Sequence, residues 1–331
     1  MIIEHLPSIF LALMGLSVLI YAMLDGYDLG VGILLPMDDR QQRDQMIASI
    51  GPFWDANETW LVLAIGILLI AFPSAYSLVL NELYIPVALM LIGLILRGVS
   101  FDFRAKAVTH FQEMWDILFK VGSLMAATTQ GYCLGMYVMG FASSWQAYCF
   151  ALLSAAGVTA AYAYIGGAWL VLKTEGEVQR YAAKWSRRAG WLAAIGIGAI
   201  CIINPIISPM VAERWLTLPG AILLLPIPLM SVLLIFVVDR YLRRVPHEQD
   251  FGCWIPFSGV ATLFLLCLVG LAYSYFPYVV PNRITAIEAA SASESLMFVF
   301  YGVALVFPVI VAYTIFSYWM FKGKSTALKY W

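Results

Sequence analysis

Charged residues are scarce in this sequence. Lys, Arg, Asp and Glu make up 12% of its 331 residues, while 62% of the residues are hydrophobic. An average soluble domain has about 25% charged residues, which keep its surface hydrated. This composition excludes an ordinary soluble domain and favours a protein whose surface lies in lipid. A formal net charge of −1 also gives no reason to expect nucleic acid as a partner.

Histidine and paired cysteines are also scarce. The three histidines, His5, His110 and His247, fall outside the apolar runs or at their ends. None is therefore predicted at the membrane centre, where it could ligate a haem iron. The five cysteines show no CxxC spacing, so neither a disulfide framework nor a metal site is predicted. We expect the chain to ligate no metal or haem and to perform no redox chemistry alone.

Long apolar runs are what the sequence does contain. Each is long enough to cross about 30 Å of hydrocarbon as a helix, so the runs predict an all-α polytopic membrane protein. Because the connections are too short for a separate domain, residues 1–331 are expected to form a single integral membrane domain. The first run has no Lys or Arg before it and no cleavage pattern, which favours a retained span over a signal peptide. Nine transmembrane helices are predicted, at about residues 7–36, 50–73, 76–99, 116–139, 144–172, 190–208, 219–239, 254–276 and 296–321.

Basic residues are divided unevenly between the predicted connections. One set of connections holds only Arg214 and Arg283. Because Lys and Arg are retained on the cytoplasmic side, the N-terminus is predicted outside and the C-terminus in the cytoplasm. The odd number of spans agrees with this orientation. The basic residues on the predicted cytoplasmic side are Arg40, Arg43, Arg104, Lys106, Lys173, Arg180, Lys184, Arg187, Arg188, Arg240, Arg243, Arg244, Lys322, Lys324 and Lys329.

Acidic residues lie inside the first two predicted spans. Asp25 and Asp28 precede the inner end of the first span by roughly ten residues, and Asp55 and Glu58 lie at a comparable depth in the second. Each pair is spaced i, i+3, which places both members on one face of a helix. A charge that faces lipid near the membrane centre costs about 2.5 to 3.5 kcal/mol. We therefore expect both faces to turn inward, toward each other or toward a partner.

A basic residue is available to neutralise part of this charge. Arg97, near the inner end of the third span, is the predicted counter-charge, and Asp102 and Arg104 continue a polar trail to the interface. Gly26 and Gly30 form a small-xxx-small step that would let another helix approach the acids closely. We therefore expect the acids and Arg97 to meet between packed helices.

Two interpretations of the acids stay open. Neighbouring carboxylates in a desolvated site can hold and pass protons. Alternatively, the acids cap the start of the second span, pair with Arg97 and lock three helices together. Trp54 and Trp60, which flank the acids of the second span, are interface or packing aromatics, or else lie along a route for oxygen.

Three stretches of the chain resemble the N-terminal signature of subunit II of the cytochrome bd-type quinol oxidases, including the cyanide-insensitive type. They are LDGYDLGVG at 24–32, GPFWDANETWL at 51–61 and LRGVSFDFRAK at 96–106. No comparably sharp motif follows in the rest of the chain. The residues that carry the resemblance are Asp25, Gly26, Asp28, Gly30, Gly32, Pro52, Trp54, Asp55, Asn57, Trp60, Arg97, Phe101, Asp102 and Arg104.

The resemblance implies a partner and a reaction. In that family the larger subunit I carries haems b558, b595 and d and the quinol-oxidising loop, and subunit II forms a pseudo-symmetric heterodimer with it. The complex, in the bacterial cytoplasmic (inner) membrane, passes electrons from quinol to dioxygen to make water and takes protons from the cytoplasm. The implied fold is two four-helix bundles plus one peripheral helix. A small single-helix accessory subunit and a structural quinone or lipid are also implied, the latter without contacts assigned to residues here.

The resemblance also assigns roles to residues. Asp55 and the acids of the first span would line a proton route toward the haems, and Trp60 would lie near the region of oxygen access. Glu58 departs from members that carry a neutral residue there, so its share in the route is an open question. A proton-coupled secondary transporter remains an alternative, because intramembrane acids and Gly-rich helices also occur in transporters. A purely structural assembly subunit of the same oxidase is the other alternative.

Overall fold

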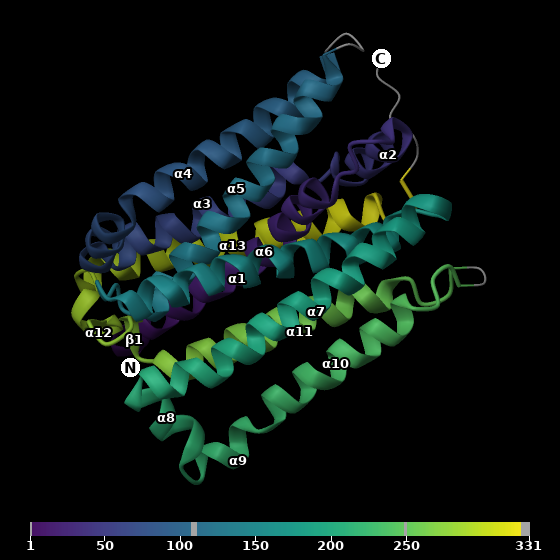
Figure 1. Ribbon diagram of the computed structural model, residues 1–331. Coiled ribbons are helices and arrows are strands. Elements are labelled where there is room, and N and C mark those ends of the chain that lie inside the picture. Colours follow the sequence, from purple (N-terminus) through teal and green to yellow (C-terminus); the bar gives the residue numbers. More distant parts are fainter. Residues whose placement is uncertain (1, 107–110, 248–249, 326–331) are drawn as a thin grey trace.

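Long helices that run side by side make up most of the fold (Figure 1). The computed structural model describes residues 2–106, 111–247 and 250–325. The short elements are α2 (Arg40–Ile50), α8 (Pro209–Leu216), α9 (Gly220–Leu224), β1 (Tyr278–Val280), β2 (Ile284–Thr285) and α12 (Ala286–Ala289). The long helices are α1 (Ile2–Leu34), α3 (Trp54–Ala71), α4 (Pro73–Lys106), α5 (Gln112–Val138), α6 (Trp145–Lys173), α7 (Gly176–Ile207), α10 (Pro226–Leu242), α11 (Trp254–Tyr275) and α13 (Ser293–Met320).

The described part of the chain has eight helical segments that are long and apolar enough to cross a membrane. They correspond to eight of the predicted spans, so the chain is an all-α, multi-pass membrane protein. The remaining predicted span, 116–139, is occupied by α5, which packs against α4 and α6. Its sequence includes Asp116, Lys120 and Gln130, which lower its hydropathy. The ninth crossing therefore stays a prediction.

Several predicted boundaries were wrong, and the reason is the same in each case. Helix α4 continues to Lys106, and α7 already begins at Gly176, although the predicted spans were 76–99 and 190–208. Hydropathy falls where charged residues begin, but a helix can continue beyond the hydrocarbon into the polar interface. The predicted connection after the first span likewise contains α2, whose N-cap is Asp39.

The span predicted at 219–239 corresponds to the segment Gly220–Leu242. Within it, α9 ends at Leu224 and α10 begins at Pro226, while Leu225 between them keeps helical dihedral angles. Proline has no backbone N–H to continue a helix but fits well in its first turn. The connection at 277–295 contains short elements of its own, because β1 and β2 pair as an antiparallel hairpin beside α12.

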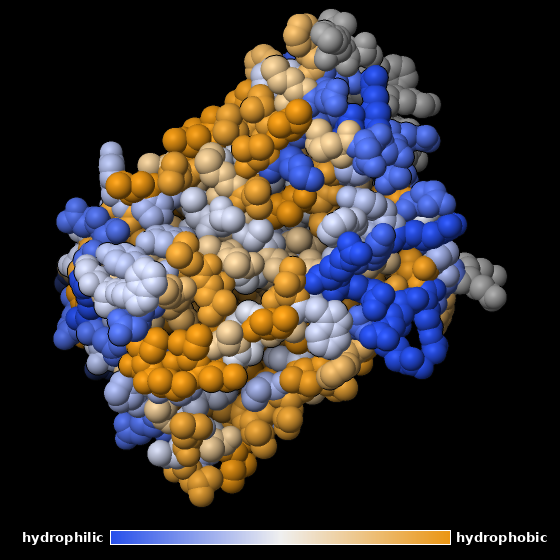
Figure 2. Space-filling view, in the orientation of Figure 1, coloured by the Kyte–Doolittle hydropathy of each residue, from blue (hydrophilic) through white to orange (hydrophobic). Residues whose placement is uncertain are grey.

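The two ends of the helical assembly differ in polarity. Helix α1 begins at the end that holds β1 and α12, whereas α13 runs toward the opposite end, where α2 lies (Figure 1). Figure 2 shows strongly hydrophilic residues at the α2 end and hydrophobic residues along the sides between the ends. The basic connections predicted to share one side of the membrane meet at the α2 end: Arg104 of α4 contacts Asp44 of α2, and Lys324 contacts Asp250. His110 and Lys329 lie outside the described residues.

Helix α1 is central to the packing, with α3, α5, α6, α11 and α13 around it. Its closest approach is to α6, where a Cβ atom added to Gly30 would lie 1.8 Å from the backbone oxygen of Tyr162. Only glycine permits this contact, so the predicted small-residue step does bring a helix close to the acids. The main apolar core beside it contains Tyr27 and Trp169, whose rings stack at 4.2 Å between centroids.

Candidate functional site

The buried guanidinium of Arg97 on α4 contacts three carboxylates. Its Nη1 atom lies 2.8 Å from Asp25 Oδ1 and 2.7 Å from Glu58 Oε1. Its Nη2 atom lies 3.5 Å from Asp28 Oδ2. Asp25 and Asp28 on α1 are fully buried, whereas the side chain of Glu58 on α3 is 29% exposed. We call Asp25, Asp28, Glu58 and Arg97 the central acid cluster.

This cluster is short of positive charge, and its hydrogen bonds are incomplete, since Nε and Nη2 of Arg97 also lack well-aligned partners among the described residues. One guanidinium faces three carboxylates, which gives a formal charge of −2 when all are ionised. Within the described residues, both carboxylate oxygens of Asp25 and Oδ1 of Asp28 accept no well-aligned hydrogen bond. Asp25 and Arg97 therefore form a close ion pair whose geometry is not that of a hydrogen bond. Because burying a charge is costly unless it is paired and hydrogen-bonded, negative charge in this cluster is only partly compensated.

A polar branch joins the cluster to the C-terminal helix α13. The amide Nδ2 of Asn57, which is buried, donates to Asp28 Oδ2 at 2.8 Å and to the Tyr27 hydroxyl at 2.9 Å. The Tyr318 hydroxyl donates to Asn57 Oδ1 at 3.1 Å and lies 2.6 Å from the Tyr27 hydroxyl. Sequence patterns indicated Asn57 but not Tyr318, which is 261 positions away along the chain. Asn57 therefore fixes Asp28 while linking α1, α3 and α13.

A second branch extends from the cluster toward α5 and α6. Tyr21 lies one turn before Asp25 on α1 and is buried. Gln130 Nε2 of α5 donates to the Tyr21 hydroxyl at 2.6 Å, and the Tyr162 hydroxyl of α6 donates to Gln130 Oε1 at 2.7 Å. The sequence analysis missed these three residues, although an isolated Gln within an apolar helix is a signal that could have indicated Gln130.

Two of the predicted acids lie outside the cluster. Asp55 is exposed in the first turn of α3, one turn before Glu58, and Asp102 is exposed on α4. Asp102 lies five positions after Arg97 on α4. Its side chain therefore points about 140° away from that of Arg97 around the helix axis. The predicted polar trail therefore does not run through Asp102. Asp55 stays beside the cluster on the surface of the chain rather than between the helices.

The two predicted tryptophans differ in their surroundings. The Trp54 ring is half-buried, and its centroid lies 5.7 Å from the guanidinium carbon of Arg97, which is a cation–π distance. Trp60 is buried, and its ring meets the edge of Phe307 on α13 at 6.0 Å. Trp54 thus contacts the cluster, whereas Trp60 packs α3 against α13.

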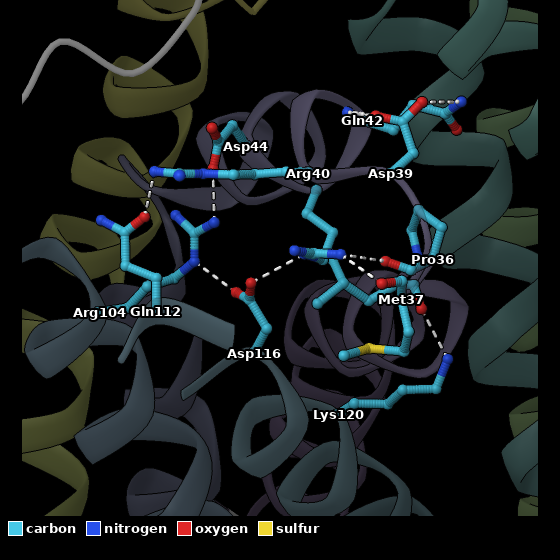
Figure 3. Close-up of polar contacts among 12 residues, drawn as sticks. Pro36, Met37, Asp39, Arg40, Gln42, Asp44, Arg104, Gln112, Asp116 and Lys120 are labelled. Carbon is cyan, nitrogen blue, oxygen red and sulfur yellow. Dashed lines mark hydrogen bonds and ion pairs between the residues drawn. The ribbon is translucent and has the colours of Figure 1, made fainter. Parts of the chain in front are cut away.

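Arg104 belongs to a separate network near the α2 end (Figure 3). It contacts both Asp116 of α5 and Asp44 of α2. Arg43 Nε of α2 lies 2.8 Å from the other oxygen of Asp116. We call Arg43, Asp44, Arg104 and Asp116 the end network. Its two positive and two negative groups balance, and Arg43 Nη1 also donates to the backbone oxygen of Met37. Nearby, Arg40 Nη2 donates to Gln112 Oε1, and Lys120 Nζ donates to the backbone oxygen of Leu35.

Side chains that bind metal ions do not gather at one place in the described residues. No group of three or more His, Cys, Asp or Glu side chains in residues 2–106, 111–247 and 250–325 is placed to hold a metal ion. Of the described histidines, His5 is exposed, and His247 contacts the backbone oxygen and ring of Tyr241. These residues therefore do not fit a haem iron.

The fold and the site define a multi-pass helical membrane protein with an acid-rich ion-pair cluster buried between its helices. The family of cytochrome bd terminal oxidase subunit II matches residues 6–321. The chain belongs to this family, which confirms the resemblance of the three N-terminal motifs and makes it a subunit of a respiratory terminal oxidase.

Relatives and a solved structure agree with this assignment. Subunit 2 of the cytochrome bd-I ubiquinol oxidase of Escherichia coli strain K12 is 26% identical over 98% of this chain and 96% of its own length. Subunit 2 of the cytochrome bd ubiquinol oxidase of Bacillus subtilis strain 168 is 27% identical over 92% of each chain. The bd oxidase structure from Geobacillus thermodenitrificans contains a chain with a TM-score of 0.77 and 15% identity, matched over 96% of this chain and 97% of that chain. This last likeness shows that the fold is shared.

Proposed function

We propose that the chain is the non-haem subunit of a bd-type quinol:dioxygen oxidoreductase and that its central acid cluster carries protons from the cytoplasmic side. Catalysis, with haems b558, b595 and d and the quinol, is assigned to the partner subunit I. The observation that carries the proposal is the contact of three carboxylates with the single guanidinium of Arg97 in a buried site.

The central acid cluster contains more acidic than basic groups, which favours the binding and release of protons. Like charges that share a desolvated site repel, and binding a proton relieves that repulsion. Asp25 and Asp28 are buried, whereas Glu58 reaches the surface of the chain beside the exposed Asp55. This order offers a stepwise route between the interior and the surface of α3. We place the crossing to the haem-bearing subunit there, because an exposed acid in a membrane-facing helix needs a polar or charged partner.

The proposed orientation of the chain in the membrane follows from the distribution of its basic residues. We propose that the α2 end, which holds the basic connections, is cytoplasmic and that the N-terminus lies outside. The chain would then cross the bacterial cytoplasmic membrane nine times, with α5 as the ninth crossing. A pseudo-symmetric heterodimer with subunit I, a small accessory subunit and a bound quinone or lipid belong to the same proposal.

A structural role is the second candidate, and the geometry of Arg97 supports it. Its ion pairs join α1, α3 and α4, so the cluster could serve to hold the bundle together and stabilise subunit I. The proton-coupled transporter considered from the sequence has no comparable support, since the chain belongs to an oxidase family. The proton role and the structural role predict different effects on turnover when an acidic residue of the cluster is replaced by a neutral one.

Neutral substitutions at the surface of α3 test the proton role. The complex with its haem-bearing partner would be purified with Asp55→Asn or Glu58→Gln, and quinol-driven oxygen consumption measured per haem. We expect slower turnover with normal haem content, because the route loses an ionisable group while the fold is kept. Unchanged turnover in both variants would contradict the proton role, and loss of haem would favour the structural one. Glu113→Gln, which neutralises an exposed acid at the start of α5, is the matched control.

A further inference from the structure

The branch through Tyr21, Gln130 and Tyr162 has no part in the route described above. It connects α1, α5 and α6 by two short hydrogen bonds, of 2.6 Å between Gln130 Nε2 and the Tyr21 hydroxyl and 2.7 Å between the Tyr162 hydroxyl and Gln130 Oε1. Tyr21 and Tyr162 are both buried. A polar chain of this kind inside an apolar bundle needs an explanation, because each buried polar group is costly unless it is paired.

The hydrogen bonds of the branch have a direction. Tyr162 gives its hydroxyl hydrogen to Gln130, and Gln130 gives an amide hydrogen to the oxygen of Tyr21. The hydroxyl hydrogen of Tyr21 is therefore left to point elsewhere. Its neighbour along the same face of α1 is Asp25, one helical turn away. The carboxylate oxygens of Asp25 are those that lack well-aligned donors among the described side chains.

We propose that Tyr21, oriented by Gln130, is the positioning hydrogen-bond donor that steadies the negative charge of Asp25 during proton transfer. Arg97 from α4 attracts that charge, whereas Asp28 from α1 and Glu58 from α3 repel it. Tyr21 adds a neutral donor that leaves the excess of acid in place. The inference rests on the proposed proton role of the central acid cluster.

The far end of the branch is anchored rigidly. A Cβ atom added to Gly26 would lie 2.8 Å from the ring of Tyr162, so α1 packs directly on this ring. The ring also stacks with Phe264 of α11, at 6.2 Å between centroids and 8° between planes. Because Tyr162 is packed against both α1 and α11, it holds the orientation of Gln130 and, through it, that of Tyr21.

The branch leads away from the proposed crossing at α3. It runs from Asp25 through α5 to the buried Tyr162 on α6, whereas Glu58 and Asp55 reach the surface on α3. A route that ends at a packed tyrosine delivers no proton to a partner. Tyr21 and Gln130 therefore act through Asp25 rather than as a second path.

The test uses two substitutions in the complex purified with its haem-bearing partner. Tyr21→Phe removes one hydroxyl, and Gln130→Met removes the amide at similar size. Losing one hydrogen bond to a charged group is expected to slow quinol-driven oxygen consumption per haem by about tenfold or more in Tyr21→Phe. Gln130→Met should slow it less, with normal haem content and unchanged KM for quinol in both. The control is Tyr137→Phe, which removes the hydroxyl of a half-buried tyrosine that donates to the backbone oxygen of Val279, and it should keep the wild-type rate.

A double-mutant cycle separates action through Asp25 from a packing effect. If Tyr21 acts through Asp25, Tyr21→Phe will slow turnover in the wild-type background but not further in Asp25→Asn. A wild-type rate in Tyr21→Phe, or an equal slowing in both backgrounds, overturns the inference.

The outcome for Asp25 alone keeps the two proposals apart. If Asp25→Asn consumes oxygen at the wild-type rate, the proposed proton role fails and the inference about Tyr21 fails with it. If Asp25→Asn is slow but Tyr21→Phe is not, only the inference about Tyr21 fails. A loss of haem in Tyr21→Phe but not in Tyr137→Phe would show a structural function of Tyr21 and would also overturn the inference.

Discussion

The central acid cluster and the end network are both built on buried arginines, but they differ in balance. In the end network, Arg43 and Arg104 share the two oxygens of Asp116, and Asp44 completes the pairing. In the central acid cluster, one arginine serves three acids whose oxygens are incompletely hydrogen-bonded in the described structure. The two sites therefore respond differently to a proton.

A balanced network loses an ion pair when it binds a proton, whereas an acid-rich cluster loses a repulsion. The end network is thus suited to hold α2, α4 and α5 together at one end of the bundle. The central acid cluster is suited to change its charge. The predictions that follow remove one group at a time from each site.

The largest effect is expected from Arg97→Gln. It leaves the buried Asp25 and Asp28, and the partly exposed Glu58, without their counter-charge, and breaking a buried pair in this way costs about 3 to 5 kcal/mol. We expect little complex to be recovered, as measured by haem content of membranes and by thermal unfolding in detergent. Arg187→Gln is the control, because Arg187 is 35% exposed beside Asp239 and exposed pairs contribute at most about 1 kcal/mol.

A second change should partly rescue Arg97→Gln. Adding Asp25→Asn removes one of the unpaired acids, so the double variant is expected to give more folded complex than Arg97→Gln alone. The yield of haem-containing complex measures this rescue. Equal yields from the single and double variants would show that charge imbalance is not what destabilises the site.

Asp116→Asn should be the next most damaging change, but only to stability. It weakens the shared acceptor of Arg43 and Arg104 and is expected to lower the free energy of unfolding by about 3 kcal/mol. The complex that does assemble should consume oxygen per haem at the wild-type rate. A slow but stable Asp116→Asn complex would place the end network on the proton route instead.

The sequence predicted the central acid cluster better than it predicted the end network. The i, i+3 spacing of Asp25 and Asp28 on one apolar span and the single Arg97 on another made their meeting foreseeable. Arg43 and Asp116 are 73 positions apart, and both lie next to span ends, where charges were interpreted as topology signals. Nothing local in the sequence indicates that such charges pair.

The helices themselves were predicted well, and their ends were not. Hydropathy reports which residues can face lipid, so it located the spans but ended α4 and α7 too early. It also read Tyr21 and Tyr162 as part of apolar runs, because a tyrosine that makes a buried hydrogen bond looks the same in sequence as one that only packs. The branch to Asp25 depends on the register of α1, α5 and α6, which requires the three-dimensional structure.

A smaller effect is expected from Tyr318→Phe. The change removes the hydrogen bond to Asn57 Oδ1 and the contact with the Tyr27 hydroxyl, while the ring keeps its stacking on Phe53. We expect a loss of about 1 kcal/mol in the free energy of unfolding, seen as a slightly lower Tm. Because Asn57 still holds Asp28, turnover per haem should stay near wild type. Much slower turnover would extend the proton route into α13.

The smallest effect is expected at the N-cap of α2, the helix that carries Arg43 and Asp44 of the end network. The backbone N–H of Gln42 donates to the Asp39 carboxylate at the N-cap of α2 and holds the pKa of Asp39 below its usual value. The cap is therefore fully present above the pKa of Asp39 in the unfolded chain, about 3.9, and is lost as pH falls through the lower folded value. Amide exchange of Gln42, corrected for its intrinsic pH dependence, should accelerate there. Asp39→Asn, which keeps a capping oxygen, should remove this pH dependence.

The most direct test of the central claim is the rate of quinol-driven oxygen consumption per haem in Asp25→Asn, measured beside Asp116→Asn. Loss of a group that transfers protons is expected to slow turnover by about a hundredfold. Asp25→Asn should therefore be slow with normal haem content, while Asp116→Asn is less stable but turns over normally. A wild-type rate in Asp25→Asn would contradict the proton role of the central acid cluster.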